Sequence, residues 1–126
     1  AMIRHRATHE QLNAVNALNE VGFDYPRETE RLYPRGTMAA HVLGFITPGK
    51  GGAMGIERAF DRELGRRALT GEPLALSLDA RVQAALELEL SEAVANLEAQ
   101  GGSGLVLDVD TGEIVAMASN PTFDPN

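Results

Sequence analysis

Two apolar runs in the last quarter of the chain constrain its fold more than any other feature. Residues 104–109 and 113–118 are apolar at nearly every position, and Asp110-Thr111-Gly112 joins them. Runs of this length around a glycine-containing turn predict a β-hairpin, with Gly112 in the positive-φ position of the loop. Strands that are apolar on both sides need cover on both faces, and a two-stranded hairpin is not stable alone.

The segment before the hairpin predicts the longest helix, over residues 79–100. One helical stripe collects its large apolar side chains, which are Val82, Leu86, Leu90, Val94 and Leu97. We expect Asp79 to cap this helix and Gly101-Gly102 to end it. Its glutamates, Glu87 among them, are assigned to the solvated side. Residues 74–78 are apolar and predict a short strand before it.

The first half of the chain alternates short helical patterns with turns. Apolar spacing predicts helices over residues 8–21, 37–43 and 53–64, the second capped by Thr37 and ended by Gly44. Residues 23–33 are expected to be extended, as an edge strand interrupted by Pro26. Residues 49–52 are expected to form a flexible loop. Together with the hairpin, these elements predict an α+β fold.

Charge divides the chain in two. Residues 1–73 carry ten Lys/Arg and nine Asp/Glu, whereas residues 74–126 carry nine acids and one cation, Arg81, for a net charge of −8. The polar, glycine-containing segment 65–73 lies at this change, so we expect two domains, 1–73 and 74–126. A half with one cation is unsuited to binding nucleic acid, because contact with phosphates requires several basic side chains. The absence of cysteine excludes disulfides and thiolate metal sites.

Three short patterns suggest ligand sites and are better explained as ordinary structure. Residues 44–50 spell GxxxxGK, but Gly51 stands where a phosphate-binding loop needs Ser or Thr. His5 and His9 lie four residues apart and lack a third metal ligand. Asp108 and Asp110 resemble the start of a calcium loop without its twelve-residue frame. We therefore predict no metal, nucleotide or other cofactor.

No nucleophile lies near a base at a recognisable spacing. Lys50 is the only lysine, and Thr47 rather than serine stands three residues before it, so the SxxK motif is absent. Gly51-Gly52 follow Lys50, so there is no KTG motif either. We predict no catalytic residue in this chain and no enzyme activity of its own.

Five blocks, in order along the chain, resemble class B penicillin-binding proteins, most closely the cell-division transpeptidase that cross-links septal peptidoglycan. The blocks are residues 31–36, 40–44, 55–64, 76–83 and 108–126, and the resemblance extends over residues 20–126. It implies that residues 1–73 are a fragment of the non-catalytic pedestal, or dimerisation, domain. It implies that residues 74–126 are the first helix and hairpin of a truncated transpeptidase domain, whose catalytic serine follows after Asn126.

The resemblance also implies a cellular setting. The intact protein would lie in the periplasm, anchored to the inner membrane, and would act in septal cell-wall synthesis during cell division. Its pedestal would dock divisome membrane proteins, including the glycan polymerase partner. The alternative is the pedestal of an elongation-type or resistance-type class B transpeptidase. In either case the parent would be a serine acyltransferase that binds β-lactams.

The expected site is structural. Arg31 on the extended segment and Glu57 on a helix are suited to a bidentate, charge-assisted bond that ties these elements together. His41 either joins this pair or fills a half-buried slot. The full set of candidate structural and interaction residues is Arg31, Tyr33, Pro34, His41, Gly44, Gly55, Glu57, Phe60, Asp79 and Gly112.

By resemblance, the two hairpin strands join a larger sheet whose other members follow Asn126. Truncation is therefore expected to leave at least one strand edge unpaired and to drive self-association through the hairpin, as an artefact and not as a physiological interface. We expect Leu105 and Leu107 on one face of the first strand, with Val106 and Met117 contributing to the opposite face. Folding of the hairpin back onto the helix 79–100 is the alternative; it covers one face and still leaves an edge open.

Overall fold

The computed structural model describes residues 7–19, 22–24 and 30–126. These residues form five helices and two small antiparallel sheets, which confirms the α+β class. The elements are α1 (His9–Asn16), α2 (Ala40–Leu43), β1 (Ile46–Thr47), β2 (Gly51–Gly52), α3 (Gly55–Ala59), α4 (Asp61–Thr70), α5 (Ala80–Asn96), β3 (Gly102–Leu107) and β4 (Ile114–Asn120).

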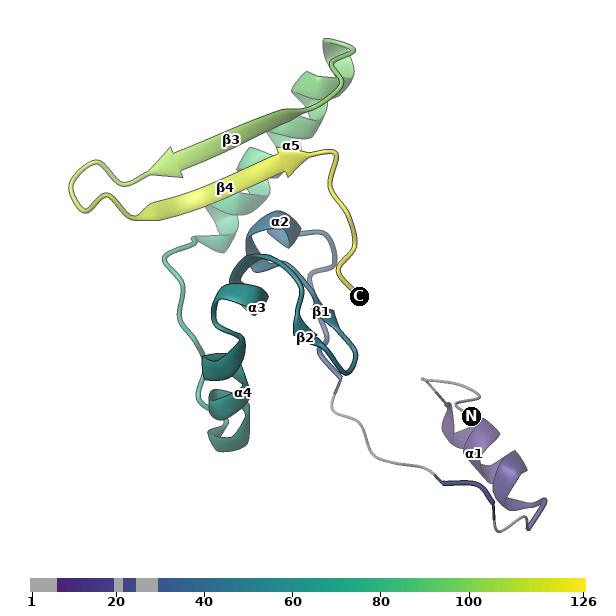
Figure 1. The fold of residues 1–126 in the computed structure, drawn as a ribbon. Coiled ribbons are helices and arrows are strands. Elements are labelled where there is room, and N and C mark those ends of the chain that lie inside the picture. Colours follow the sequence, from purple (N-terminus) through teal and green to yellow (C-terminus); the bar gives the residue numbers. More distant parts are fainter. Residues whose placement is uncertain (1–6, 20–21, 25–29) are drawn as a thin grey trace.

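Helix α5 and the hairpin β3–β4 form one unit, the helix–hairpin unit (residues 79–120), in which α5 lies against one face of the strands (Figure 1). Small residues in the strands make this contact close. A Cβ atom added to Gly104 would lie only 2.7 Å from Cδ1 of Leu86. The predicted helix and hairpin are both present, and of the two packing alternatives the structure shows the hairpin folded onto the helix.

The strand register corrects the predicted faces. Leu105 pairs with Met117 and Val106 with Ala116. Ala116 is completely buried against α5, whereas the side of the sheet away from α5 carries Leu105 at 53% exposure and Met117 at 36%. Val106 therefore faces the helix with Ala116, and its predicted place beside Met117 is wrong. The alternation along each strand was predictable, but the register between strands depends on the turn and on the bulge near Leu107.

The second unit, the α2–α4 unit (residues 30–71), departs most from the predicted elements. The helix expected over 53–64 is broken at Phe60, which separates α3 from α4. Helix α4 then continues through Gly65 to Thr70 and ends at Gly71, which has a φ of 73°. An ion pair between Glu63 and Arg67, one helical turn apart at 2.8 Å, supports this continuation into the segment expected to be a boundary.

Three further expectations in short segments are wrong. Residues 51–52 are not a flexible loop but β2, which pairs with β1. Thr37 does not cap α2, which begins after Ala39 with no side-chain cap. Residues 74–78 form no strand and cross between the two units without regular structure.

Other expectations differ in their limits or lie outside the described residues. Helix α5 stops at Asn96 instead of continuing to residue 100, and Glu98 follows with a φ of 50°. Helix α1 is shorter than predicted, and positions 20–21 of that prediction lie outside the described residues. So do positions 25–29 of the expected edge strand; residues 30–33 of that strand have no regular structure.

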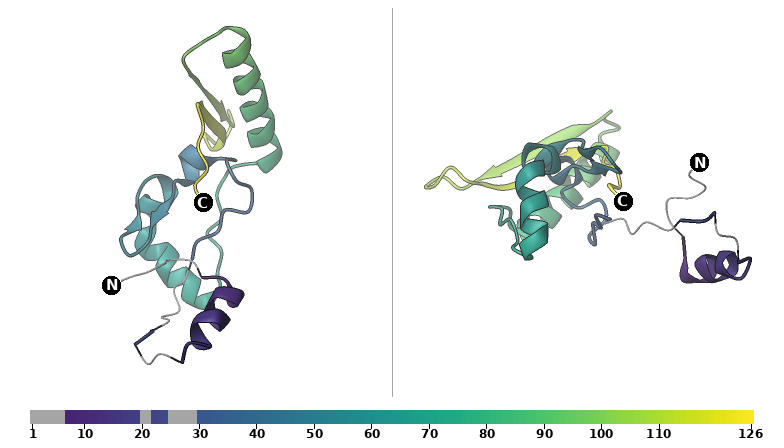
Figure 2. Two further views of the ribbon diagram at one scale, coloured as in Figure 1. Left: turned by 90° about the vertical axis from the view of Figure 1, so that its right-hand side faces the viewer. Right: turned by 60° about the horizontal axis from the view of Figure 1, so that its bottom comes forward.

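Several of the buried residues lie near the place where the two units meet. Ala40 of α2 is 1% exposed, Gln83 of α5 is 1% exposed, and Ala118 of β4 is 4% exposed. Helix α2 contacts β4 directly. Figure 2 shows the helix–hairpin unit on one side of this contact and the α2–α4 unit on the other, with α1 set apart. The junction between the units therefore forms part of the core of the described structure, beside the contact of α5 with β4.

Candidate functional site

The expected ion pair between Arg31 and Glu57 is present, with one hydrogen bond instead of the bidentate contact that was expected. Nε of Arg31 donates to Oε1 of Glu57 at 2.7 Å, and the Glu57 side chain is only 7% exposed while that of Arg31 is 50% exposed. Arg31 also lies over the ring of Tyr33, 5.5 Å from its centre. The hydrogen bond to Glu57 raises the pKa of Arg31, and burial, followed by the charge of Glu57, raises the pKa of Tyr33.

Gly44 and Gly55 hold the backbones of α2 and α3 together. A Cβ atom on Gly44 would overlap the carbonyl group of Met54, and one on Gly55 would lie 2.5 Å from the carbonyl oxygen of Val42. Both glycines have positive φ, 76° and 61°. This close approach sets the start of α3 and so places Glu57 within reach of Arg31.

His41 does not join the ion pair but lies in an aromatic cluster. Its ring meets that of Phe123 edge to face at 5.0 Å, and Phe45 meets Phe123 in the same way at 5.9 Å. The cluster joins the α2–α4 unit to segment 121–126. Pro34 lies in a turn closed by a bond from the N–H of Gly36 to the carbonyl of Tyr33.

Side-chain amides and carboxylates bridge the two units. The amide of Gln83 accepts from the N–H of Met117 at 2.9 Å and donates to the carbonyl of the same residue at 2.8 Å. It also donates to Oε1 of Glu87, and this oxygen in turn accepts from the N–H of Ala39 at 2.7 Å. One chain of hydrogen bonds therefore runs from β4 through α5 to the start of α2.

Segment 121–126 makes a second bridge. Oδ1 of Asn126 accepts from the N–H of Tyr33 at 2.8 Å, and Nδ2 of Asn126 donates to the carbonyl of Tyr33 at 3.2 Å. Asp124 orients this amide by accepting from Nδ2 at 2.8 Å. The segment thus returns from the end of β4 to the residue beside the Arg31–Glu57 pair.

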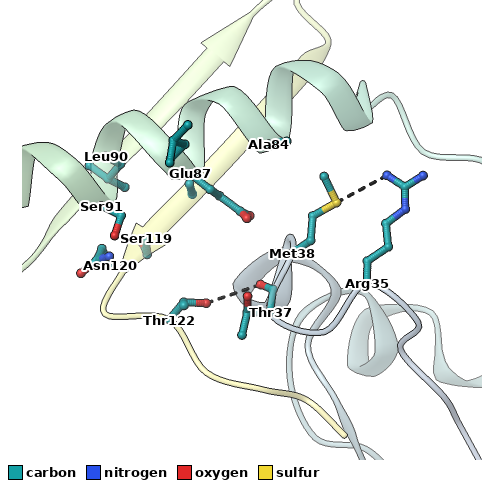
Figure 3. Close-up of a pocket in the computed structure, with 12 residues that line it drawn as sticks. Arg35, Thr37, Met38, Ala84, Glu87, Leu90, Ser91, Ser119, Asn120 and Thr122 are labelled. Atoms are coloured by element: carbon teal, nitrogen blue, oxygen red, sulfur yellow. Dashed lines mark hydrogen bonds between the residues drawn. The ribbon is translucent and has the colours of Figure 1, made fainter.

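A shallow pocket of about 350 Å³ lies beside these bridges, between the 35–38 loop, α5 and the end of β4 (Figure 3). Met38 and Arg35 approach each other on one side of it, where an N–H of Arg35 donates to the Met38 sulfur at 3.5 Å. On the other side the Thr122 hydroxyl reaches the carbonyl of Thr37 at 3.5 Å. Glu87 points from α5 toward the 35–38 loop, in line with its bond to the neighbouring Ala39.

The remaining predicted residues have local roles. Asp79 caps α5 by accepting from the N–H groups of Arg81 and Val82. The bond from the Arg81 guanidinium, followed by these backbone bonds, lowers the pKa of Asp79 to about 2. Gly112 has a φ of 75° in the β3–β4 turn, as predicted. Phe60 marks the break between α3 and α4 and is 39% exposed.

Sequence reasoning missed the residues that bridge the units. Glu87 was assigned to solvent, yet it bonds the backbone of α2, and Gln83, Phe123 and Asn126 were not singled out. One signal was present: Gln83 and Glu87 are four residues apart, and Gln83 adjoins the apolar stripe at Val82. A long-range donor such as the Ala39 N–H, 48 positions away from Glu87, has no local signature.

The bridging residues hold the two units together through hydrogen bonds to backbone groups. Within the described ranges, no three His, Cys, Asp or Glu side chains lie close enough together to hold a metal ion. None of the described helices is both long and apolar enough to cross a bilayer.

Comparisons with known proteins point to one group. The chain is 44% identical over 121 residues to the probable peptidoglycan D,D-transpeptidase FtsI of Caulobacter vibrioides, covering 94% of this chain and 20% of that protein. It is 34% identical to peptidoglycan D,D-transpeptidase FtsI of Escherichia coli, covering 89% and 23%. No family model matches the chain.

A solved structure agrees. The crystal structure of penicillin binding protein 3 from Mycobacterium tuberculosis, complexed with aztreonam, superposes with a TM-score of 0.63 at 32% identity, over 76% of this chain and 23% of that one. The chain therefore spans only about a fifth to a quarter of the length of the proteins that it matches.

Proposed function

We infer a structural role from the family of this chain, which belongs to the FtsI-type peptidoglycan D,D-transpeptidases, a group of class B penicillin-binding proteins. The region it represents contains no SxxK or KTG motif. We propose that it is a non-catalytic module that positions the catalytic part of a septal transpeptidase and docks divisome membrane proteins, including the glycan polymerase partner. The intact protein would act in the periplasm, anchored to the inner membrane.

One observation carries the positioning role: two independent sets of hydrogen bonds join the α2–α4 unit to the helix–hairpin unit and the segment after it. Glu87 fixes the start of α2 against α5, and Asn126 fixes Tyr33 against the segment that follows β4. Both bridges use paired or charge-assisted bonds, which define direction as well as distance. A module held in this way transmits the orientation of one unit to the other.

The positioning role is tested in the complete gene product from which this region comes. We expect Glu87→Gln and Asn126→Ala to slow covalent labelling by a fluorescent penicillin about tenfold when combined, because misplacement by about 1 Å can cost more than that. Glu92→Gln, an exposed position on α5, is the matched control. Unchanged labelling by folded bridge variants would refute the positioning role.

The isolated 126-residue chain provides a second test. It should show no covalent labelling by the same penicillin, because acylation needs a nucleophilic serine activated by a nearby base. Labelling that survives denaturation would show that the chain carries catalytic groups of its own and would contradict its assignment as non-catalytic.

The docking role has its own readout. The immobilised chain should bind the purified glycan polymerase partner of its source organism in detergent, saturably and more tightly than an unrelated polytopic membrane protein. Equal binding to both membrane proteins would contradict docking and leave the positioning role standing.

A further inference from the structure

Ala39, the residue before α2, has a left-handed backbone with a φ of 54° and a ψ of 23°. Alanine disfavours this conformation by about five- to thirtyfold relative to the right-handed one, because its Cβ lies too close to the following carbonyl oxygen. Such a conformation persists only where the surrounding structure imposes it. The contacts of Ala39 therefore show what holds the start of α2.

Hydrogen bonds at both ends of the residue hold Ala39. Its N–H donates to Oε1 of Glu87 at 2.7 Å, and its carbonyl accepts from the N–H groups of Val42 and Leu43 at 2.9 Å and 2.8 Å. In a capping box, a glutamate of the same helix accepts from the N–H of the capping residue. Here the glutamate belongs to a different helix, and Ala39 has no polar side chain of its own. Helix α5 therefore supplies the cap of α2.

Helix α2 has only four residues, which form a single turn. A helix of this length is not stable on its own, because the first turn fixes several dihedral angles for one hydrogen bond. Figure 1 shows α2 between the helix–hairpin unit and α3, and it contacts both β4 and α3. Its formation therefore depends on these neighbours.

Both bridges between the units reach α2. The first is the bond from Glu87 to the residue at its start. The second, through the segment after β4, reaches α2 at Phe123, whose ring meets that of His41 at 5.0 Å. Near the end of α2, a Cβ atom on Gly55 of α3 would lie 2.5 Å from the carbonyl oxygen of Val42. One short helix therefore contacts both bridges and the start of α3.

We propose that α2 is a two-state switch that couples the two bridges. In the formed state, Glu87 holds Ala39 in its left-handed conformation and α2 is helical. In the released state, Ala39 leaves that conformation, α2 unwinds and Phe123 loses its ring partner on α2. Strain at Ala39 favours release and the bond to Glu87 opposes it, so a change at either bridge shifts the same equilibrium.

The switch is distinct from the positioning role proposed above. Hydrogen exchange reports whether α2 is formed, whereas labelling by penicillin reports whether the catalytic part responds. Unchanged labelling in variants that release α2 would therefore refute positioning and leave the switch standing.

Exchange of the Val42 and Leu43 amides measures the formation of α2, because both bond the carbonyl of Ala39. The measurement is made on the complete gene product, by mass spectrometry with fragmentation to single amides. Glu87→Ala should speed both exchange rates about tenfold, in line with the loss of a hydrogen bond to a charged group. Glu89→Ala, at an exposed position of the same helix, is the matched control and should leave both rates unchanged.

Two glycine substitutions test the strain. Ala39 and Ala40 are 8% and 1% exposed, so each glycine variant loses a buried methyl group. Only residue 39 is left-handed, and glycine adopts that conformation without steric cost. Ala40→Gly should therefore speed exchange of the Leu43 amide, and exchange in Ala39→Gly should be slower than in Ala40→Gly by at least about fivefold.

The coupling has its own readout at Tyr33, whose N–H donates to Asn126 in the second bridge. Among the described residues, Glu87 and Asn126 share no hydrogen-bond partner. Glu87→Ala should nevertheless speed exchange of the Tyr33 amide about fivefold. Asn126→Ala should speed exchange of the Leu43 amide by the same factor, because coupling between two sites is reciprocal.

The Ala116 amide separates a local switch from loss of the whole fold. Ala116 is completely buried in the β3–β4 ladder, and its exchange rate should be the same in Glu87→Ala as in the wild type. Equal acceleration at Ala116 and Leu43 would show general unfolding and would overturn the proposal. Exchange in Ala39→Gly as fast as in Ala40→Gly would show that residue 39 stores no strain, and a Tyr33 amide that ignores Glu87→Ala would show that α2 does not couple the bridges. Either result would also overturn it.

Discussion

Gln83 pairs with Met117 as a neighbouring β-strand would, with one side-chain amide satisfying both the N–H and the C=O of the same residue, at 2.9 Å and 2.8 Å. A glutamine that is 1% exposed is unusual among apolar neighbours, because a buried amide is costly unless its bonds are made. Here they are made, and they connect α5, β4 and, through Glu87, the start of α2.

Gln83→Leu should destabilise the fold by about 2–4 kcal/mol, although leucine has a similar size, because it removes the partner of both the N–H and the C=O of Met117 and of the Glu87 carboxylate. Urea unfolding monitored by circular dichroism measures the loss. Gln100→Leu makes the same chemical change at an exposed position and should stay within about 0.5 kcal/mol of the wild type. Equal losses in the two variants would contradict a structural role for the Gln83 amide.

Arg31→Ala should cost about 1–3 kcal/mol, less than the loss for a fully buried pair because half of the Arg31 side chain is exposed. The cost arises because the buried carboxylate of Glu57 loses its cation. Arg31→Lys keeps the charge, weakens the contact with the Tyr33 ring, and should fall between Arg31→Ala and the wild type.

Urea midpoints of Arg31→Ala, Glu57→Ala and the double variant form a thermodynamic cycle. The double variant should lose less than the two single losses together, with a coupling of at least about 0.5 kcal/mol. Additive losses would mean that the pair contributes no interaction energy of its own.

The sequence was most informative where structure depends on near neighbours. The Asp79 cap, the α5 stripe and the Gly112 turn all lie within a few residues of their partners. The cap and the turn are present, and so is the stripe except for Leu97, which follows the last residue of α5 and is 77% exposed. The Arg31–Glu57 pair could be predicted although 26 positions separate the two residues, because both lie in blocks that resemble the family and their opposite charges can form an ion pair. These predictions rest on local geometry or on charge.

The predictions that failed concern residues whose partners lie far away in the sequence. Glu87 looks like a solvated helix residue until α2 is placed beside α5, and the N–H of Ala39 then gives it a bond. The β1–β2 pair exists because α3 packs against β2, not because two glycines favour a strand. The pairing of Leu105 with Met117 and of Val106 with Ala116 joins the faces of the two strands, and the faces were assigned without it.

Asn126→Ala should release Tyr33 from the segment that follows β4, since the amide of Asn126 supplies both of the bonds that join them. We expect the Tyr33 amide to exchange with solvent about tenfold faster, in line with the loss of one or two hydrogen bonds. Asn96→Ala, at an exposed position at the end of α5, is the control and should leave Tyr33 unchanged. Unaltered exchange in Asn126→Ala would show that the bridge is not maintained in solution.

The Asp79 carboxyl should titrate at about pH 2, well below its ordinary pKa of 3.8, because Arg81 and two backbone N–H groups bond its charged form. A depressed pKa means that the charged cap contributes fully above pH 4 and is lost as the pH falls toward 2. The side chain of Arg81 is the largest cause, so Arg81→Ala should raise this pKa while leaving the backbone bonds in place.

Carboxyl carbon shifts followed by NMR from pH 6 to pH 1.5, a range chosen to span both pKa values of Asp79, measure the change. Asp108 provides the internal control, since backbone N–H groups of Thr111 and Asp110 lower its pKa and Arg81 makes no contact with it. A wild-type Asp79 that titrates near 3.8, or a pKa that Arg81→Ala leaves unchanged, would show that the guanidinium does not hold the cap in solution.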